Sequence, residues 1–283
     1  MYKSLKIMMI LLPIAAGLAA AGEQPPAESE DTASLRRVRI YDPADKEHLA
    51  VIRRYFREGL PEGYKLKIEV ELTFDSSQEG AVRELPIVVV PIDEDGLRNG
   101  SELHYRPWSP LQRSIEYKDD VKHGIERGYR YSQELRENCV AEEVHWKEGK
   151  MHGPRRFFHP DGSVQMEAEF DEGQPVGASK SYTAHGKVVE VTPYKNGQMH
   201  GERVQYWPGT DVPRRIIPYE MGTVEGTVKD FHESGKVRRL MPFRKGLLHG
   251  IEQEFDAAGK VIRERFWLEG EMVPRGRFEQ EFE

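Results

Sequence analysis

The residues with the most regular spacing and a capacity for chemistry are histidines. Four of the ten, His123, His152, His200 and His249, each stand directly before a glycine. Imidazole nitrogens bind zinc and transfer protons near neutral pH. Zinc needs its ligand atoms at about 2.0–2.1 Å, whereas histidines in successive β-hairpins are spaced by roughly 10 Å. We therefore assign these histidines to turns and predict no metal site.

Cys139 and His145 are the second candidate for chemistry, as a thiol–imidazole pair. They lie in a variable stretch that carries no supporting motif. The chain also lacks a G-x-S-x-G nucleophile turn, an H-E-x-x-H zinc motif and a glycine-rich phosphate loop. The single cysteine excludes an intrachain disulfide. The sequence thus predicts no catalytic residue, no cofactor and no enzymatic activity.

Composition narrows the fold class. The chain has 283 residues, of which 38% are apolar and 31% charged, with 26 Gly and 27 aromatic residues. Few aliphatic residues argue against a large α/β enzyme with buried parallel strands, and abundant aromatic residues argue against a disordered acidic chain. The net charge of −7 gives no electrostatic reason to expect nucleic acid as a partner. The Glu-rich stretches are interpreted as solvated strand faces.

The start of the chain predicts export. Two lysines precede an apolar run (7–18), and three alanines at 19–21 give a small-residue cleavage pattern. The apolar stretch 7–22 has 16 residues, fewer than the roughly 20 that span a bilayer. We therefore expect a signal peptide at 1–21 and a disordered spacer at 22–34. The mature chain would have no stable membrane span and would reside in the periplasm, the cell envelope or the extracellular space.

Glycines recur along the rest of the chain at a nearly fixed interval. The segments share the pattern aromatic–x–x–Gly–x–x–x–Gly, as at Tyr194, Gly197 and Gly201. From Gly124 to Gly250 the second glycine recurs after 29, 24, 24, 25 and 24 residues. Such glycines are typical of hairpin turns, where φ is positive. The predicted turn glycines are Gly100, Gly124, Gly149, Gly153, Gly173, Gly177, Gly197, Gly201, Gly222, Gly226, Gly246, Gly250 and Gly270.

Two aromatic columns accompany these glycines. One column stands five residues after the second glycine and includes Phe158, Tyr182, Tyr206, Phe231 and Phe255. The other stands three residues before the first glycine and includes Trp146, Phe170, Tyr194, Tyr219, Phe243 and Trp267. A second turn, such as Pro160-Asp161-Gly162, separates the columns, and the flanking residues alternate as in half-buried strands. The columns are interpreted as a structural spine rather than as a platform for stacking a ligand.

The pattern resembles the MORN-repeat variant family. The resemblance covers residues 35–282 and is strongest between Gly100 and Gly270, with an earlier copy expected at 56–63. It implies an all-β fold, an elongated single antiparallel meander sheet of about nine tandem hairpins of 24 residues.

This resemblance divides the mature chain into three segments. We expect divergent hairpin repeats at 35–100 and regular repeats at 101–270. Residues 271–283 would form a closing strand and cap, with the strand near 277–282. Such a cap would protect the last strand from pairing with another chain.

Three functions are compatible with such a repeat. The favoured hypothesis is a non-enzymatic exported scaffold that binds an unknown protein partner through an extended sheet face. The family resemblance also permits an antitoxin-like neutraliser of a toxin partner. Exposed aromatic columns would instead favour an envelope module that binds glycans or lipids, and the exposure of Tyr194, Tyr206 and Tyr219 is the discriminating observation.

Overall fold

A computed structural model describes residues 36–74, 82–106, 110–133 and 136–281 of the chain. The predicted signal peptide and spacer lie outside these residues. The chain divides between Cys139 and Val140 into two compact units, which we call the N-terminal unit and the C-terminal unit. Strand β7 (Glu137–Lys147) spans the division.

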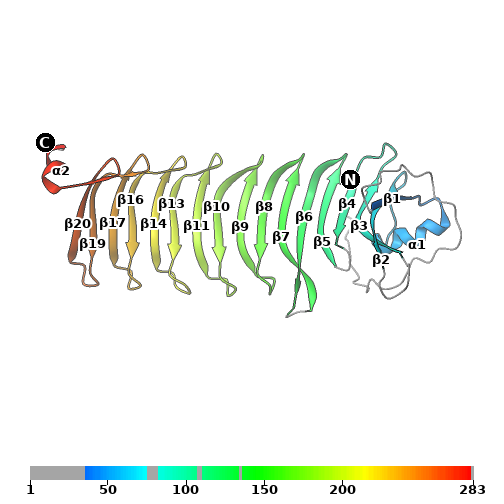
Figure 1. Cartoon of the computed structure of the whole chain (residues 1–283), viewed down its shortest axis with the longest axis horizontal. Coiled ribbons are helices and arrows are strands. Elements are labelled where there is room, and N and C mark those ends of the chain that lie inside the picture. The colour runs from blue at the N-terminus through cyan, green and yellow to red at the C-terminus, as the bar shows by residue number, and fades with distance from the viewer. Residues whose placement is uncertain (1–35, 75–81, 107–109, 134–135, 282–283) are drawn as a thin grey trace. The chain divides into compact units, whose positions relative to one another are not determined.

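The N-terminal unit combines antiparallel strands with one helix (Figure 1). Its strands pair in chain order from β1 to β6. The elements are β1 (Arg36–Tyr41), α1 (Lys46–Tyr55), β2 (Lys65–Phe74), β3 (Val82–Ile92), β4 (Gly100–Tyr105), β5 (Leu111–Lys118) and β6 (Val121–Ser132).

Helix α1 begins at a capping residue and buries one apolar side. The side chain of Asp45 accepts a hydrogen bond of 2.8 Å from the backbone N–H of Glu47, which satisfies one of the free donors at the start of the helix. Ile52 and Phe56 are buried and form one cluster with Leu66 and other residues of the sheet. The hairpin copy expected at 56–63 is therefore wrong, because Phe56 ends this helix and belongs to the core.

The C-terminal unit is built from tandem antiparallel hairpins, in which each strand pairs with its neighbours along the chain (Figure 1). This confirms the predicted fold class. After β7, its elements are β8 (Lys150–Phe158), β9 (Val164–Asp171), β10 (Gln174–Tyr182), β11 (Val188–Lys195), β12 (Gln198–Met199), β13 (Gly201–Tyr206), β14 (Pro213–Glu220), β15 (Thr223–Val224), β16 (Gly226–Phe231), β17 (Val237–Arg244), β18 (Leu247–Leu248), β19 (Gly250–Phe255), β20 (Val261–Leu268), β21 (Glu271–Val273) and α2 (Arg275–Glu281).

Two-residue turns join the hairpins at one edge of this unit. Asn196 and Gly197 connect β11 to β12 with φ of 51° and 78°, and Met221 and Gly222 connect β14 to β15 with φ of 45° and 83°. Positive φ at both central residues gives the tight turn whose twist matches that of the flanking strands. The first glycine of each predicted pair therefore lies in a turn, and the same holds at Gly149, Gly173, Gly246 and Gly270.

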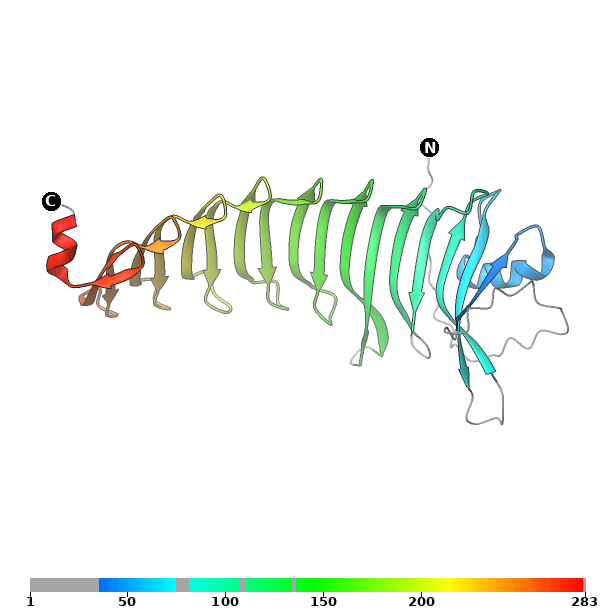
Figure 2. The ribbon, with the colours of Figure 1, turned by 45° about the horizontal axis from the view of Figure 1, so that its top comes forward.

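The second glycine of each pair lies within or at the start of a strand, not in the turn. Gly201 and Gly250 have φ of 106° and 124°, each two residues after a short strand ends. A Cβ atom on Gly250 would lie 2.8 Å from Cγ of Pro242 on the preceding strand. The backbone N–H of His249 donates to the carbonyl of the same proline at 3.0 Å. Glycine is needed here because the chain bulges and bends over a proline ring, and Figure 2 shows these bends along the edge of the unit.

This bulge corrects part of the prediction from sequence. The glycines predicted as turns that lie instead in strands are Gly100, Gly124, Gly153, Gly177, Gly201, Gly226 and Gly250. Their positive φ was anticipated correctly, but the reason for it differs, because a strand residue rather than a loop residue adopts it.

The end of the C-terminal unit is a short helix. The closing strand expected near 277–282 is wrong, because β21 ends at Val273 and α2 occupies Arg275–Glu281. Pro274 has no backbone N–H to extend the ladder, and its carbonyl accepts hydrogen bonds from the N–H groups of Arg277 and Phe278. The buried ring of Phe278 lies 5.3 Å from that of Phe266 on β20. A helix rather than a strand therefore closes the sheet.

Candidate interaction surface

The two faces of the C-terminal sheet carry different side chains. Side chains alternate between faces along a strand, and residues paired across strands share a face. Asp230 pairs with Arg215 on one side and Arg239 on the other, and we call their face the ladder face. Val204 pairs with Ile216 on the opposite face, which we call the apolar face.

Each face is defined by the register of all its strands. The ladder face includes Glu142, Arg155, Glu190, Arg203, Gln205, Arg215, Asp230, Arg239, Glu252 and Arg265. The apolar face includes Tyr182, Val191, Val204, Tyr206, Ile216, Phe231, Leu240 and Phe255. It also carries polar and charged residues, namely Arg156, Glu167, Lys180, Lys229, Gln253 and Glu264.

A pair of opposite charges recurs on the ladder face. Its two members stand on the strands before and after a two-residue turn, 13 or 15 residues apart. The Arg203 guanidinium donates to Glu190 at 2.8 Å. Arg215 donates two hydrogen bonds to Asp230 at 2.5 and 2.9 Å. The remaining pairs are Arg155 with Glu142 and Arg239 with Glu252.

Two of these carboxylates are almost fully buried. Asp230 and Glu252 are 1% and 2% exposed. Arg265 and the indole N–H of Trp267 each donate to Glu252 at 2.8 Å, in addition to the bonds from Arg239. A buried carboxylate without such partners would cost several kcal/mol, on the order of 3–5. The hydrogen bonds from the arginines and the tryptophan therefore compensate for the burial of these two acidic residues on the ladder face.

The partners also fix the charge of these acids. Burial raises the pKa of Asp230, but the hydrogen bond from Arg215 and the nearby arginine charges outweigh it, so the pKa lies below its ordinary value. Burial likewise raises the pKa of Glu252, and hydrogen bonds from Arg239 and Trp267 reverse the shift. Both carboxylates are thus ionised at neutral pH, and each accepts hydrogen bonds from its neighbours. Their chemistry is structural rather than that of a general base.

The order of charge reverses along the ladder face. In two units the acid precedes the turn and the arginine follows it, as in Glu190 and Arg203. In two later units the arginine comes first, as in Arg215 and Asp230. Gln205 lies at the reversal, where its amide donates to Glu190 at 2.8 Å and accepts from Arg214 at 3.4 Å. An amide suits this place because it carries both a donor and an acceptor.

The charged ladder was missed at the level of sequence, where charged residues were interpreted as solvated. The signal is nevertheless present, since oppositely charged residues stand 13 or 15 positions apart in four hairpins. This spacing bridges one hairpin, so it identifies the pair only once the position of the hairpin turn is known.

The two predicted aromatic columns lie on opposite faces. Tyr219 pairs with Gly201 on the ladder face, and Trp267 pairs with Gly250. Tyr206 lies on the apolar face, next along the strand from Gln205. All eleven predicted rings are half-buried, including the three named as discriminating. They are neither an exposed platform nor a buried core.

The apolar face of the C-terminal unit corresponds to a covered face in the N-terminal unit. Leu103 and Tyr105 stand three and five residues after Gly100, as Val204 and Tyr206 stand after Gly201. Leu103 is 5% exposed and shares a cluster with Ile52 and Phe56 of α1, whereas Val204 is only half-buried. Within the described residues of the C-terminal unit, helix α2 packs at the end of this face, on β20. The position of Tyr105 is thus aromatic in every hairpin of the C-terminal unit, whereas the position of Leu103 is apolar at Val204 and polar or charged at Arg156, Lys180, Lys229 and Gln253.

The histidines predicted in turns take different places. The backbone N–H groups of His200 and His249 donate to the carbonyl oxygens of Pro193 and Pro242 at the bulges. His152 lies 3.0 Å from Asp171, and together with Glu172 its ligand atoms fall within 4.8 Å. Carboxylates of the next hairpin turn, rather than a second histidine, therefore approach this imidazole.

The His152 cluster has limited capacity for a metal. Glu172 is bonded to the ammonium of Lys150 at 2.7 Å, which neutralises its charge. Three donors are also fewer than the four that a structural zinc site uses. Cys139 is half-buried, and its thiol lies 3.9 Å from the carbonyl of Glu137.

Comparison with known proteins agrees with the architecture. The model of the MORN repeat variant family matches residues 151–172, 175–196, 224–245 and 248–269. The intervening hairpin, β13 and β14, has the same turn, bulge and ladder positions although the model does not match it. A search of curated proteins found no match.

The four repeats indicate a general kind of function. MORN repeats are generally modules of protein or lipid interaction, and scaffolds built from them are typically non-catalytic. Within the described residues, no helix is both long and apolar enough to cross a membrane. Residues 151–269 of the chain therefore contain four repeats of the MORN variant.

Proposed function

We propose that this protein is a non-enzymatic, exported scaffold that binds a protein partner through the apolar face of its C-terminal unit. The observation that carries the proposal is the half-buried aromatic column of this face together with Val191, Val204 and Ile216, which pair across three adjacent strands. Half-buried aliphatic and aromatic residues that continue over several strands are typical of interaction surfaces. The ladder face is a poorer candidate, because its charges already bind one another.

The test is photo-crosslinking with the full-length chain. A photoreactive phenylalanine at position 206 reports on the apolar face, and the same residue at position 194 reports on the ladder face. The two native tyrosines are both half-buried, so the substitutions are matched. We expect one protein to crosslink from position 206 in the exported fraction and not from position 194. Crosslinks from position 194 alone, or from neither position, would contradict the proposal.

Identification of the crosslinked protein separates this proposal from the antitoxin-like alternative. A secreted or envelope protein supports the scaffold, and a toxin whose activity the chain suppresses supports the neutraliser. Vesicles crosslinked from position 206 without any protein would indicate a lipid-binding module instead.

Export is part of the proposal and has its own test. Mass spectrometry of the exported protein should find a mature chain that begins at Gly22, because the alanines at 19–21 form the cleavage pattern. Replacement of Ala21 by a bulky residue such as Arg should leave the precursor uncleaved. A chain found only in the cytosol with its first residues intact would refute export.

A further inference from the structure

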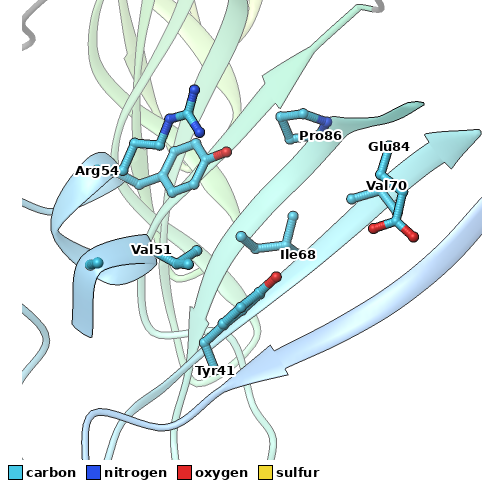
Figure 3. Close-up of a pocket in the computed structure, with 9 residues that line it drawn as sticks. Tyr41, Val51, Arg54, Ile68, Val70, Glu84 and Pro86 are labelled. Carbon is cyan, nitrogen blue, oxygen red and sulfur yellow. The ribbon is translucent and has the colours of Figure 1, made fainter. Parts of the chain in front are cut away.

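A cavity of about 210 Å³ lies inside the N-terminal unit, between helix α1 and strands β1, β2 and β3. Figure 3 shows Arg54 on the helix side and Tyr41, Ile68 and Val70 on the strand side. The cavity is thus formed within one compact unit and does not depend on the repeats of the C-terminal unit.

The floor of the cavity is apolar. It is formed by Val51 of the helix and by Ile68, Val70 and Pro86 of the sheet. Ile68 and Val70 belong to the buried core cluster, so the floor is held in place by packing. An apolar cavity of about 150 Å³ accommodates a benzene molecule. This cavity therefore has room for a ring of that size with a short substituent.

The rim carries one acidic side chain, Glu84, and one basic side chain, Arg54. Glu84 accepts hydrogen bonds from Arg39 at 2.9 and 2.7 Å, and these bonds lower the pKa of Glu84 below its ordinary value. Within the part of the chain that the structure describes, Arg54 has no hydrogen-bonded or ion-paired partner. The positive charge of Arg54 is consequently available at the opening, while the negative charge of Glu84 is neutralised.

Two tyrosines complete the rim. Tyr41 packs edge-on against His48 with ring centres 5.2 Å apart, and Tyr55 packs against Tyr105 at 6.4 Å. Burial raises the pKa of both tyrosine hydroxyls. Both hydroxyls are therefore protonated at neutral pH and able to donate a hydrogen bond to an anion.

We propose that this cavity binds a small amphiphilic carboxylate, whose ring or branched apolar group occupies the floor while its carboxylate pairs with Arg54. A ligand of this class has two sources, a free organic acid and the C-terminal residue of a polypeptide. Such a site is independent of partner binding by the C-terminal unit, because none of its residues belongs to the apolar face.

The proposal is tested by calorimetric titration of the full-length chain with matched probes. The free acid is 3-phenylpropionate, compared with its uncharged amide. The polypeptide source is acetyl-Gly-Gly-Phe, compared with the same peptide amidated at its C-terminus. We expect each acid to bind at least about tenfold more tightly than its amide, since the guanidinium–carboxylate bond is lost in the amide. Tighter binding of the peptide than of 3-phenylpropionate identifies a polypeptide end as the natural source, and the reverse order identifies a free acid.

Substitutions locate the site. Arg54→Gln should weaken binding of the acids about tenfold and leave binding of the amides unchanged. Arg53→Gln is the matched control, because Arg53 is the adjacent exposed arginine of α1 and does not line the cavity. Ala50→Phe should fill the cavity and abolish binding, with circular dichroism to verify the fold. The proposal is overturned if no probe binds at millimolar concentration, if acid and amide bind equally, or if Arg53→Gln has the same effect as Arg54→Gln.

Discussion

Individual residues of the ladder face show how a sheet one layer thick tolerates buried acids. Asp230 has a nearly inaccessible carboxylate, while its partner Arg215 keeps 40% of its side chain exposed. The carboxylate of the pair is therefore buried, whereas the guanidinium is partly in contact with solvent. This arrangement makes the acid, rather than the arginine, the residue on which local stability depends.

Replacement of Asp230 by asparagine should therefore destabilise the C-terminal unit by about 1–3 kcal/mol, because charge-assisted hydrogen bonds from Arg215 are lost. Urea unfolding followed by circular dichroism measures the loss. Glu254→Gln is the control, because Glu254 pairs with an Arg263 side chain that is 58% exposed, and exposed pairs contribute less than about 1 kcal/mol. Equal effects of the two substitutions would show that burial of the acid is not what matters.

Stability should also decline in acid. The folded pKa values of Asp230, Glu252 and Glu190 all lie below their ordinary values. The unfolded chain therefore takes up protons first, at about pH 4, and stability that is fully present above this pH is lost as the pH falls through the folded values. Melting temperatures measured from pH 7 to pH 3 should fall, and Asp230→Asn should make the decline shallower. A decline of unchanged slope in the variant would exclude Asp230 as a contributor.

At the scale of elements, the two-residue turns differ in how readily their first residue adopts a positive φ. Asn196 has a positive φ of 51°, which asparagine adopts readily, whereas Met221 has a φ of 45° at the equivalent position. Met221→Asn should thus stabilise the protein by about 1 kcal/mol. Thermal unfolding measures the gain, and Asn196→Met should lower the melting temperature by a similar amount. Opposite signs in the two variants are required for the turn geometry to be the cause.

The bulges depend on glycine for a second reason beyond φ. Gly250→Ala would place a methyl group 2.8 Å from Pro242, whereas at Gly259, with a φ of 95°, nothing lies within 4 Å. Both substitutions impose the strain of a positive φ, about 1–3 kcal/mol, but only Gly250→Ala adds a clash. Chemical denaturation should find Gly250→Ala the more damaging of the two. If Gly259→Ala is as harmful, the proline contact has no energetic role.

The hairpin repeat could be predicted from sequence because glycine spacing and alternation are local signals. The two helices were missed although their signals are also local. Asp45 precedes α1 as a cap, and Ile52 and Phe56 stand four residues apart, as on one side of a helix. The aromatic–x–x–Gly–x–x–x–Gly pattern that starts at Phe56 indicates a hairpin instead. The partners of Glu252 could not be predicted, because Arg239, Arg265 and Trp267 converge on it only after three strands are in register.

At the scale of the molecule, the main contacts of each described strand of the C-terminal unit are with its neighbours in the sheet, so stability is built up locally. Val228 is 5% exposed on β16. Val228→Ala, which should cost about 1–3 kcal/mol, is expected to accelerate amide hydrogen exchange in β14, β16 and β17 while β8 and β9 keep their protection. Exchange measured by mass spectrometry tests this. Uniform acceleration across the unit would show that it unfolds as a single cooperative body.

The reversal of charge at Gln205 limits how this array can change its length. Genes for repeat proteins grow and shrink when one copy is duplicated or deleted by unequal recombination. A copied unit with an acid before its turn, inserted after Asp230, would set that acid beside Asp230 in the position that Arg239 now occupies. We therefore expect duplication to cost more stability across Gln205 than on either side of it, so the array consists of two short series that meet at this residue.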